Sequence, residues 1–256
     1  MTDQPPDGPA APTPTVAEST GALAAVPEYL DILSTGEIEV EGRMPWSSNG
    51  TFLVSVTLGE DTLGAIYKPG RGERPLWDFP GGLFRREVAA FELSRHLGWG
   101  LVPETVLRHD GPFGSGSLQR FIDADFAEHY FTLMEHPVHH ARLREMATLD
   151  LLLNNADRKG GHCLYGECRI WGIDNGLSFH DEPKLRTVIW EFAGEEVPAH
   201  LLGYVEDVAT APPPGLAGLL ENYEMEALMG RARLILERPY FPSPHPDRRP
   251  YPWPLV

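Results

Sequence analysis

Between residues 37 and 122 the chain alternates apolar and polar positions in short runs, which is the two-residue period of β-strands. Residues 83–97 break this pattern, because Val88, Phe91 and Leu97 recur on one face of a helix and a glycine follows as an end signal. This part of the chain is therefore predicted to be a sheet interrupted by a single helix. The expected strands are EIEVEG, TFLVSVTLG, TLGAIYKP, LVPETVLRH and GSLQRFI.

Residues 137–236 have mainly the 3.6-residue period of helices. The period is clearest in VHHARLREMATLDLLLNN, where leucine and methionine recur every three or four positions. Within this region HCLYGECRIWGID is expected to form a β-hairpin that turns at Gly166 and Glu167. The second part of the chain is therefore predicted to be helical, with a hairpin near its beginning.

The two ends of the chain are both rich in proline. Residues 1–27 contain no aromatic or basic residue, so they cannot bury enough surface to offset the entropy of ordering, and we predict a disordered leader. Residues 239–256 also carry aromatic side chains, which favours a segment packed on the domain over a partner-binding tail. Between these ends we expect an N-lobe with its hinge over 36–122 and a C-lobe over 123–238.

Charge restricts the classes of partner. The 256 residues include 37 acidic and 21 basic side chains, a formal net charge of −16, which does not suit duplex nucleic acid or an anionic membrane. No apolar run approaches the roughly 18 residues that span a bilayer, and the N-terminus lacks the features of a secretion signal. We therefore expect a cytoplasmic protein with no nucleic-acid partner and no stable membrane association. The bias toward arginine, alanine, glycine and proline is typical of GC-rich bacterial coding sequences.

Three features of the strand-rich part point to phosphate binding. A turn of small residues between two strands lets backbone N–H groups approach an anion, although a plain hairpin turn has the same composition. Lys68 ends an apolar strand, and Glu87 on the following helix is a suitable partner for it; a surface lysine is the alternative. Kinases use the same order of loop, lysine and glutamate to hold nucleotide phosphates. The residues of the turn are Ser47, Ser48, Asn49 and Gly50.

A second cluster follows the helix that ends near residue 155. Asp157 could accept a hydroxyl proton, Lys159 could steady a γ-phosphate, and His162 could bind a divalent ion. Asp174 follows the predicted hairpin, which would bring its carboxylate close to the same point. Each acid alone also fits a helix cap or a turn, but the hairpin that joins them favours metal–nucleotide chemistry.

Taken together, these segments resemble the atypical kinases of the phosphatidylinositol 3-/4-kinase group. The resemblance is closest to type II phosphatidylinositol 4-kinases, with HipA-like kinases more distant, and it covers about residues 36–195. It is carried by SSNGTFLVSV for the glycine-rich loop, AIYKPGRGERP for the lysine strand, VPET for the next strand, GSLQRFI for the hinge, NADRKGGHCL for the catalytic loop and WGIDNGLSF for the metal-binding segment.

This resemblance implies an α+β, bilobal protein-kinase-like fold with a strand-rich N-lobe, a helical C-lobe and ATP in the cleft between them. Lys68 would then hold the α- and β-phosphates, and Glu87 would orient Lys68. Asp157 would be the catalytic acid–base, and Asp174 the main ligand of Mg²⁺ or Mn²⁺. The hinge beside the adenine would consist of Arg120, Phe121 and Ile122.

The chain departs from this group at three points. His162 stands where these kinases place a metal-binding asparagine, and imidazole is a softer donor than Mg²⁺ prefers; His162 could also only pack against the glycine turn. The cysteine cluster of the type II lipid kinases is missing before the helix, and no basic run for inositol phosphates follows Asp174.

We therefore expect an ATP- and metal-dependent phosphotransferase that acts on a protein hydroxyl or a small metabolite. A nucleotide-binding pseudokinase with a regulatory role and a nucleotidyl transferase that uses the same cleft are the alternatives.

Overall fold

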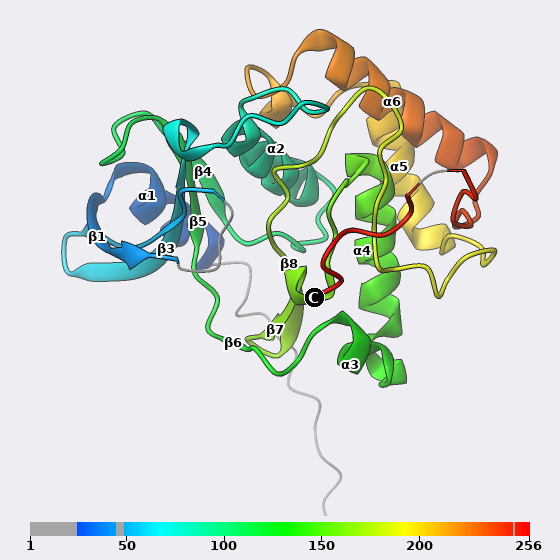
Figure 1. The fold of residues 1–256 in the computed structure, drawn as a ribbon, viewed down its shortest axis with the longest axis horizontal. Helices are drawn as coiled ribbons and strands as arrows, with labels where there is room; N and C mark the ends of the chain where they lie inside the picture. Colours follow the sequence, from blue (N-terminus) through cyan, green and yellow to red (C-terminus); the bar gives the residue numbers. More distant parts are fainter. Residues whose placement is uncertain (1–24, 45–48, 248) are drawn as a thin grey trace, which may run out of the picture.

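The computed structural model describes residues 25–44, 49–247 and 249–256 (Figure 1). The predicted leader lies outside these residues up to position 24, and so do Ser47 and Ser48 of the predicted phosphate loop. In the part of the chain that is described, no helix is long and apolar enough to cross a membrane.

A five-stranded antiparallel sheet forms the first part of the molecule, in the order β1-β2-β3-β5-β4. Its strands match the segments that the alternating pattern predicted to within one residue at Arg43 and Asp61, and otherwise lie inside them. Phe52 pairs with Tyr67 and Val54 with Ala65, so these side chains lie on one face, whereas Lys68 lies on the other. The strands are β1 (Glu37–Arg43), β2 (Phe52–Leu58), β3 (Asp61–Pro69), β4 (Thr105–Arg108) and β5 (Gly116–Arg120).

Different helices cover the two faces of this sheet. On one face α1 (Ala25–Thr35) packs Ile32 and Leu33 against Val54 and its neighbours. The helix α2 (Leu83–His96), which the sequence predicts, contacts β4 and β5 from the face that carries the strand lysine. The helix α1 is not predicted, because its apolar pattern is short and adjoins the proline-rich leader; it begins within the last three residues assigned to that leader.

The second part of the molecule is built of helices and a three-stranded sheet of order β6-β7-β8. The predicted hairpin is present as β7 and β8. Its turn residues are Glu167 and Cys168, one position later than predicted, because Gly166 pairs with Arg169. Both turn residues have positive φ, 54° and 57°, as a two-residue hairpin turn requires. The strands are β6 (Ala124–Asp125), β7 (Cys163–Gly166) and β8 (Arg169–Gly172).

The main hydrophobic core joins α2 to the helices of the second part. Leu143, Met146, Leu149 and Leu153 are all buried, so the predicted helical spacing gives α4 its core contacts. Asp150 on the same helix is also buried, although it is a carboxylate. The longer helices are α3 (Tyr130–Met134), α4 (His140–Leu153), α5 (Ala199–Thr210) and α6 (Asn222–Glu237), and the 3₁₀ helices are η1 (Gly70–Gly72), η2 (Pro137–His139), η3 (Gly160–His162) and η4 (Pro214–Leu216).

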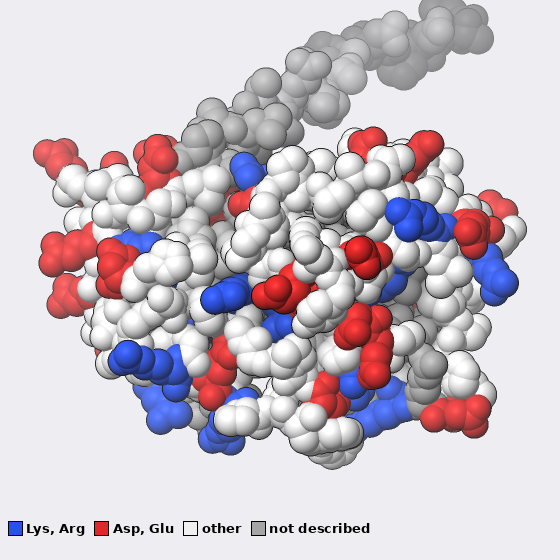
Figure 2. Space-filling model, turned by 90° about the horizontal axis from the view of Figure 1, so that it is seen from above, with Lys and Arg blue, Asp and Glu red and all other residues white. Residues whose placement is uncertain are grey.

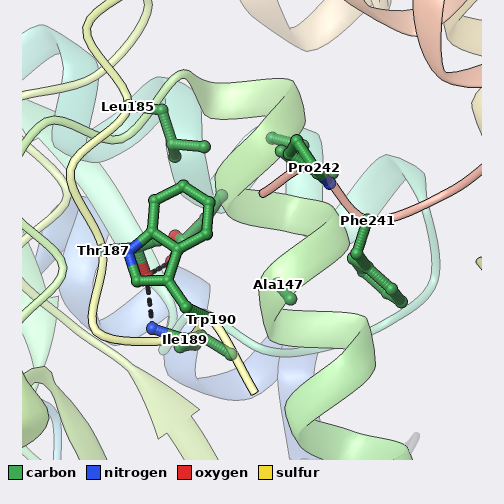
Figure 3. A pocket seen from close by; sticks show the side chains of 9 residues that line it. Ala147, Leu185, Thr187, Ile189, Trp190, Phe241 and Pro242 are labelled. Carbon is green, nitrogen blue, oxygen red and sulfur yellow. Dashed lines mark hydrogen bonds between the residues drawn. The ribbon is translucent and has the colours of Figure 1, made fainter. Parts of the chain in front are cut away.

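The proline-rich segment after α6 runs back over the helical part (Figure 1). Near α4, the side chains of Phe241, Pro242 and Trp190 pack beside the helix (Figure 3). They leave a cavity of about 10 Å³, which is roughly the space of one water molecule. This segment therefore contributes apolar contacts to the helical part.

Further along, the same segment makes backbone contacts with two loops. Thr187 donates its N–H to the Pro250 carbonyl at 3.0 Å. Gly160 donates its N–H to the Leu255 carbonyl at 2.6 Å. Residues 250–256 therefore lie beside the loop that follows α4, which contains the predicted catalytic residues.

Candidate active site

Three of the predicted site residues meet at one point. Lys68, near the end of β3, donates to Glu87 of α2 and, at 2.7 Å, to Oδ1 of Asp174, which comes two residues after β8. The Lys68 side chain is 22% exposed and that of Asp174 49%, whereas Glu87 is buried. The Asn175 backbone N–H donates to Oε2 of Glu87 at 2.9 Å. The lysine, glutamate and aspartate therefore connect β3, α2 and the segment after the hairpin.

The charges in this cluster support one another. Burial works to lower the pKa of Lys68, but the carboxylates of Asp174 and Glu87 outweigh it and raise the pKa above its usual range. The Lys68 ammonium in turn holds the pKa of Asp174 well below its usual range. Burial raises the pKa of Glu87, and Lys68 opposes that shift. Lys68 and Asp174 are therefore charged at neutral pH, so the ammonium can bind phosphate and the carboxylate can bind a metal ion.

The loop after α4 carries the predicted acid–base residue. Asn154 ends the helix in the left-handed region, with φ of 53°. Asp157 donates its backbone N–H to Oδ1 of Asn155 at 2.9 Å, and its carboxylate lies 2.9 Å from Nζ of Lys159. Burial raises the pKa of Asp157, and the neighbouring ammonium of Lys159 works against that shift. A carboxylate in this setting is suited to exchange a proton with a hydroxyl group.

His162 and Asp174, the predicted metal ligands, are in direct contact. Nε2 of His162 lies 3.3 Å from Oδ2 of Asp174, and the histidine side chain is 13% exposed. Burial lowers the pKa of His162 to about 4, so the ring is neutral at pH 7 and can donate its lone pair to a metal. Its Nδ1 has no hydrogen-bond partner among the described residues. Two ligands of one ion, each about 2.1 Å from it, lie roughly 3.0–3.4 Å apart, so the observed separation suits a shared ion.

The described residues hold no group of three or more His, Cys, Asp or Glu side chains suited to a metal. An ion at His162 and Asp174 would therefore take its other ligands from phosphate oxygens and water, which is the usual coordination of Mg²⁺ beside a nucleotide.

Asn49 and Gly50 hold the second half of the predicted phosphate loop against η1. Oδ1 of Asn49 accepts the backbone N–H of Arg74 at 3.0 Å, and Gly50 donates its N–H to the Gly72 carbonyl at 2.9 Å. A Cβ on Gly72 would lie only 3.0 Å from the Cα of Gly50, so this contact requires glycine. The loop is therefore fastened to the segment that directly follows Lys68.

The predicted hinge connects β5 to β6 and has a structural role that its sequence does not show. Arg120 forms ion pairs with Glu104, at 2.5 Å, and with Glu167 in the hairpin turn. Phe121 donates its backbone N–H to the Gly64 carbonyl at 2.9 Å. Ile122 is buried in a small apolar cluster with residues of β6, β7 and β8. The Arg120 side chain therefore links the sheet to the hairpin of the helical part.

Arg158 is a site residue that the sequence analysis misses. It is fully buried and ion-pairs with Asp150 of α4 at 2.9 Å. Its guanidinium also donates to Oδ1 of Asn175 at 2.6 Å and to the Ile173 carbonyl at 2.9 Å. The side chain thereby fixes the catalytic loop to α4 and to the segment after β8. The signal was the carboxylate of Asp150 within an apolar helical run, which requires a buried cationic partner.

No protein-family model matches the chain. It is 42% identical to "Protein Rv2133c" of Mycobacterium tuberculosis over an alignment of 262 residues, which covers 87% of this chain and 94% of that protein.

Solved structures share its fold at low sequence identity. Hydra Fam20 with sugar superimposes with a TM-score of 0.55 at 14% identity and covers 86% of this chain and 90% of that one. The Golgi casein kinase with Mn and ADP bound gives 0.50 at 13% identity, with 84% and 75% covered. The likeness confirms the predicted kinase-like fold with a sheet lobe and a helical part.

Proposed function

The chain belongs to the family of Protein Rv2133c from Mycobacterium tuberculosis, and we propose that it is an ATP- and divalent-metal-dependent phosphotransferase of the atypical kinase class. The observation that carries this proposal is the contact of Lys68 with both Glu87 and Asp174. Within a kinase-like fold, this pairing orients a lysine toward phosphate and puts a metal-binding carboxylate next to it.

ATP would lie between the N-lobe, 36–122, and the C-lobe, 123–238. Lys68 would hold the α- and β-phosphates. The proposed phosphate-binding loop consists of Ser47, Ser48, Asn49 and Gly50. The hydrogen bonds of Asn49 and Gly50 to the segment after β3 support this placement, because they hold this end of the loop close to Lys68 in the chain. The adenine would lie beside the hinge, against the apolar cluster that contains Ile122.

His162 and Asp174 would hold the metal ion. When bound, Mg²⁺ or Mn²⁺ would neutralise charge on the phosphate oxygens during transfer. Asp157 would accept the proton of the acceptor hydroxyl. Lys159 is already paired with that carboxylate, and it would steady the phosphoryl group. Arg158 would keep this loop in register with Asp174 through its bonds to Asn175 and Ile173.

We further propose that the acceptor is a protein hydroxyl or a small metabolite. Within the atypical kinases, the sequence most resembles type II phosphatidylinositol 4-kinases. The chain lacks the cysteine cluster and the basic run of that group, which is why we do not propose a lipid acceptor. We also propose a cytoplasmic location for the protein, and its net charge of −16 supports the absence of a nucleic-acid partner.

A pseudokinase is a second candidate, because His162 contacts Asp174 where an asparagine would serve Mg²⁺ better. Incubation with ATP labelled at the γ- or the α-phosphate separates the possibilities. A phosphotransferase moves only the γ-label, to water, to itself or to acceptors in a bacterial extract. A nucleotidyl transferase moves the α-label, and a pseudokinase binds ATP without moving either.

Two variants test the roles of the residues. We expect Lys68→Ala to lose nucleotide affinity by about tenfold or more, and Asp157→Asn to keep affinity but lose transfer. Lys184→Ala is the matched control, because this lysine makes only long ion pairs, of 3.9 and 3.7 Å, to Asp78 and Glu182. Nucleotide binding that is unaffected by Lys68→Ala would contradict the assignment.

A further inference from the structure

A pocket of about 480 Å³ lies at the end of the sheet near the glycine-rich loop. Phe52 and Phe113, with ring centroids 4.4 Å apart, form its aromatic wall. Phe52 pairs across the sheet with Tyr67, and Tyr67 and Lys68 point to opposite faces of β3. The aromatic wall therefore lies on the sheet face away from Lys68, whereas Gly50 of the predicted phosphate loop also lines the pocket.

The polar lining of this pocket is formed by Arg43, Arg71 and Arg74. All three are exposed, and none forms an ion pair with a carboxylate of the described residues. Glu73, the acid between two of them in sequence, accepts instead the backbone N–H groups of Gly82 and Phe84 at the start of α2. These three arginines thus line one pocket without an ion-pair partner among the described residues, in a protein of net charge −16. Like charges gathered in this way are stabilised by an anion.

The shape and the surrounding charge narrow the class of ligand. The volume falls in the range of about 300–1,000 Å³ that small-molecule sites occupy. A long polyanion would meet repulsion from the rest of the molecule as soon as it extended beyond the pocket. In the view of Figure 2, basic side chains gather toward the lower left, whereas acidic side chains lie along the left edge and across the centre.

We propose that this pocket binds a small molecule that carries a phosphate group and a flat ring. The guanidinium groups bind the phosphate, with the planar, forked geometry that suits this anion. The ring packs against Phe52 and Phe113, and Pro112 extends the apolar wall. Arg43 and Gly50 lie on either side of the loop between β1 and β2, so an occupant contacts both ends of that loop.

Phenyl phosphate is the probe, titrated into the full chain by calorimetry. We expect saturable binding at one site, weakened about tenfold or more by Arg71→Ala or Arg74→Ala, since each removes a charge-assisted contact. Arg85→Ala is the matched control, because this arginine is also exposed but does not line the pocket. Phenol and inorganic phosphate, which each carry half of the probe, are expected to bind more weakly.

Lys68→Ala separates this site from the nucleotide site. We expect this variant to bind phenyl phosphate as the wild type does, whether or not it loses ATP, so the pocket is tested independently of the proposed function. Three results would overturn the proposal: no saturation by about 10 mM probe, equal affinity in the Arg71→Ala variant, or loss of binding in Lys68→Ala. Tighter, Arg71-dependent binding of a single-stranded oligonucleotide would show a polyanion site instead.

Discussion

His162 is the proposed metal ligand whose donor atom bears most directly on which metal ion would bind. Its neutral ring touches Asp174, and imidazole favours Mn²⁺ and later transition ions over Mg²⁺ relative to an amide oxygen. The structure explains why the imidazole is available to a metal ion: a pKa of about 4 keeps the ring neutral through the physiological range. Burial, which residue spacing does not reveal, is the cause.

We predict that His162→Asn moves the metal preference toward Mg²⁺. The ratio of turnover with Mg²⁺ to turnover with Mn²⁺ is expected to rise by about tenfold or more, which is about 1.4 kcal/mol. Nucleotide affinity measured with each metal gives a second readout. His96→Asn, an exposed histidine in the last turn of α2, is the control. An unchanged metal ranking would make His162 a structural residue.

At the scale of elements, a buried ion pair joins α4 to the loop that follows it and carries the proposed catalytic residues. Asp150 of α4 and Arg158 of the loop are both buried, and Arg158 continues to Asn175 after β8. Removing one partner of such a pair leaves an uncompensated charge inside the protein. The register between α4, the loop and the hairpin therefore depends on Arg158.

Arg158→Ala is expected to lower the free energy of unfolding by about 3–5 kcal/mol, measured in urea. Arg233→Ala, on the exposed side of α6, should change it by less than about 0.5 kcal/mol. The double variant Asp150→Leu with Arg158→Met should regain part of the loss, because it removes both charges together. A loss below about 1 kcal/mol in Arg158→Ala would show that the pair does not hold these elements.

The elements that the sequence predicts best are those whose pattern is local. Alternation predicts the strands of the sheet, and helical spacing predicts α2 and α4. The turn of the hairpin is displaced by one residue, because the pairing of Gly166 with Arg169 depends on register rather than composition. The helix α1 is missed because packing of Ile32 and Leu33 on the sheet, not a long repeat, stabilises it.

The candidate site is predictable in part for the same reason. The sequence pairs Lys68 with Glu87 and places Asp174 near the loop of Asp157, and the structure brings Lys68, Glu87 and Asp174 into contact. Arg158 could not be placed, since nothing in its loop shows that its partner is Asp150 on the preceding helix. The pocket lined by Arg43, Arg71 and Arg74 could not be predicted from the sequence, because these arginines come from β1 and from the segment after β3. They line one pocket only in the folded chain.

For the whole molecule, the proposed nucleotide binding would link the two lobes, and it is expected to stabilise both. ATP with Mg²⁺ or Mn²⁺ at a hundredfold excess over Kd adds about 2.7 kcal/mol if it binds only the folded state. This corresponds to a rise in Tm of roughly 5–10 °C for a domain of this size. Lys68→Ala should reduce the shift, and thermal unfolding with millimolar nucleotide checks it. No shift with either metal would argue against the kinase assignment.

The bond between Gly160 and the Leu255 carbonyl joins the catalytic loop to a segment nearly a hundred residues further along the chain. Its consequence lies in solvent exchange. An amide hydrogen held in this way is replaced by deuterium when the bond opens, so exchange at Gly160 reports the separation of this loop from residues 250–256. Because the same amide adjoins Lys159, each such opening also frees the backbone next to the proposed phosphoryl-binding side chain.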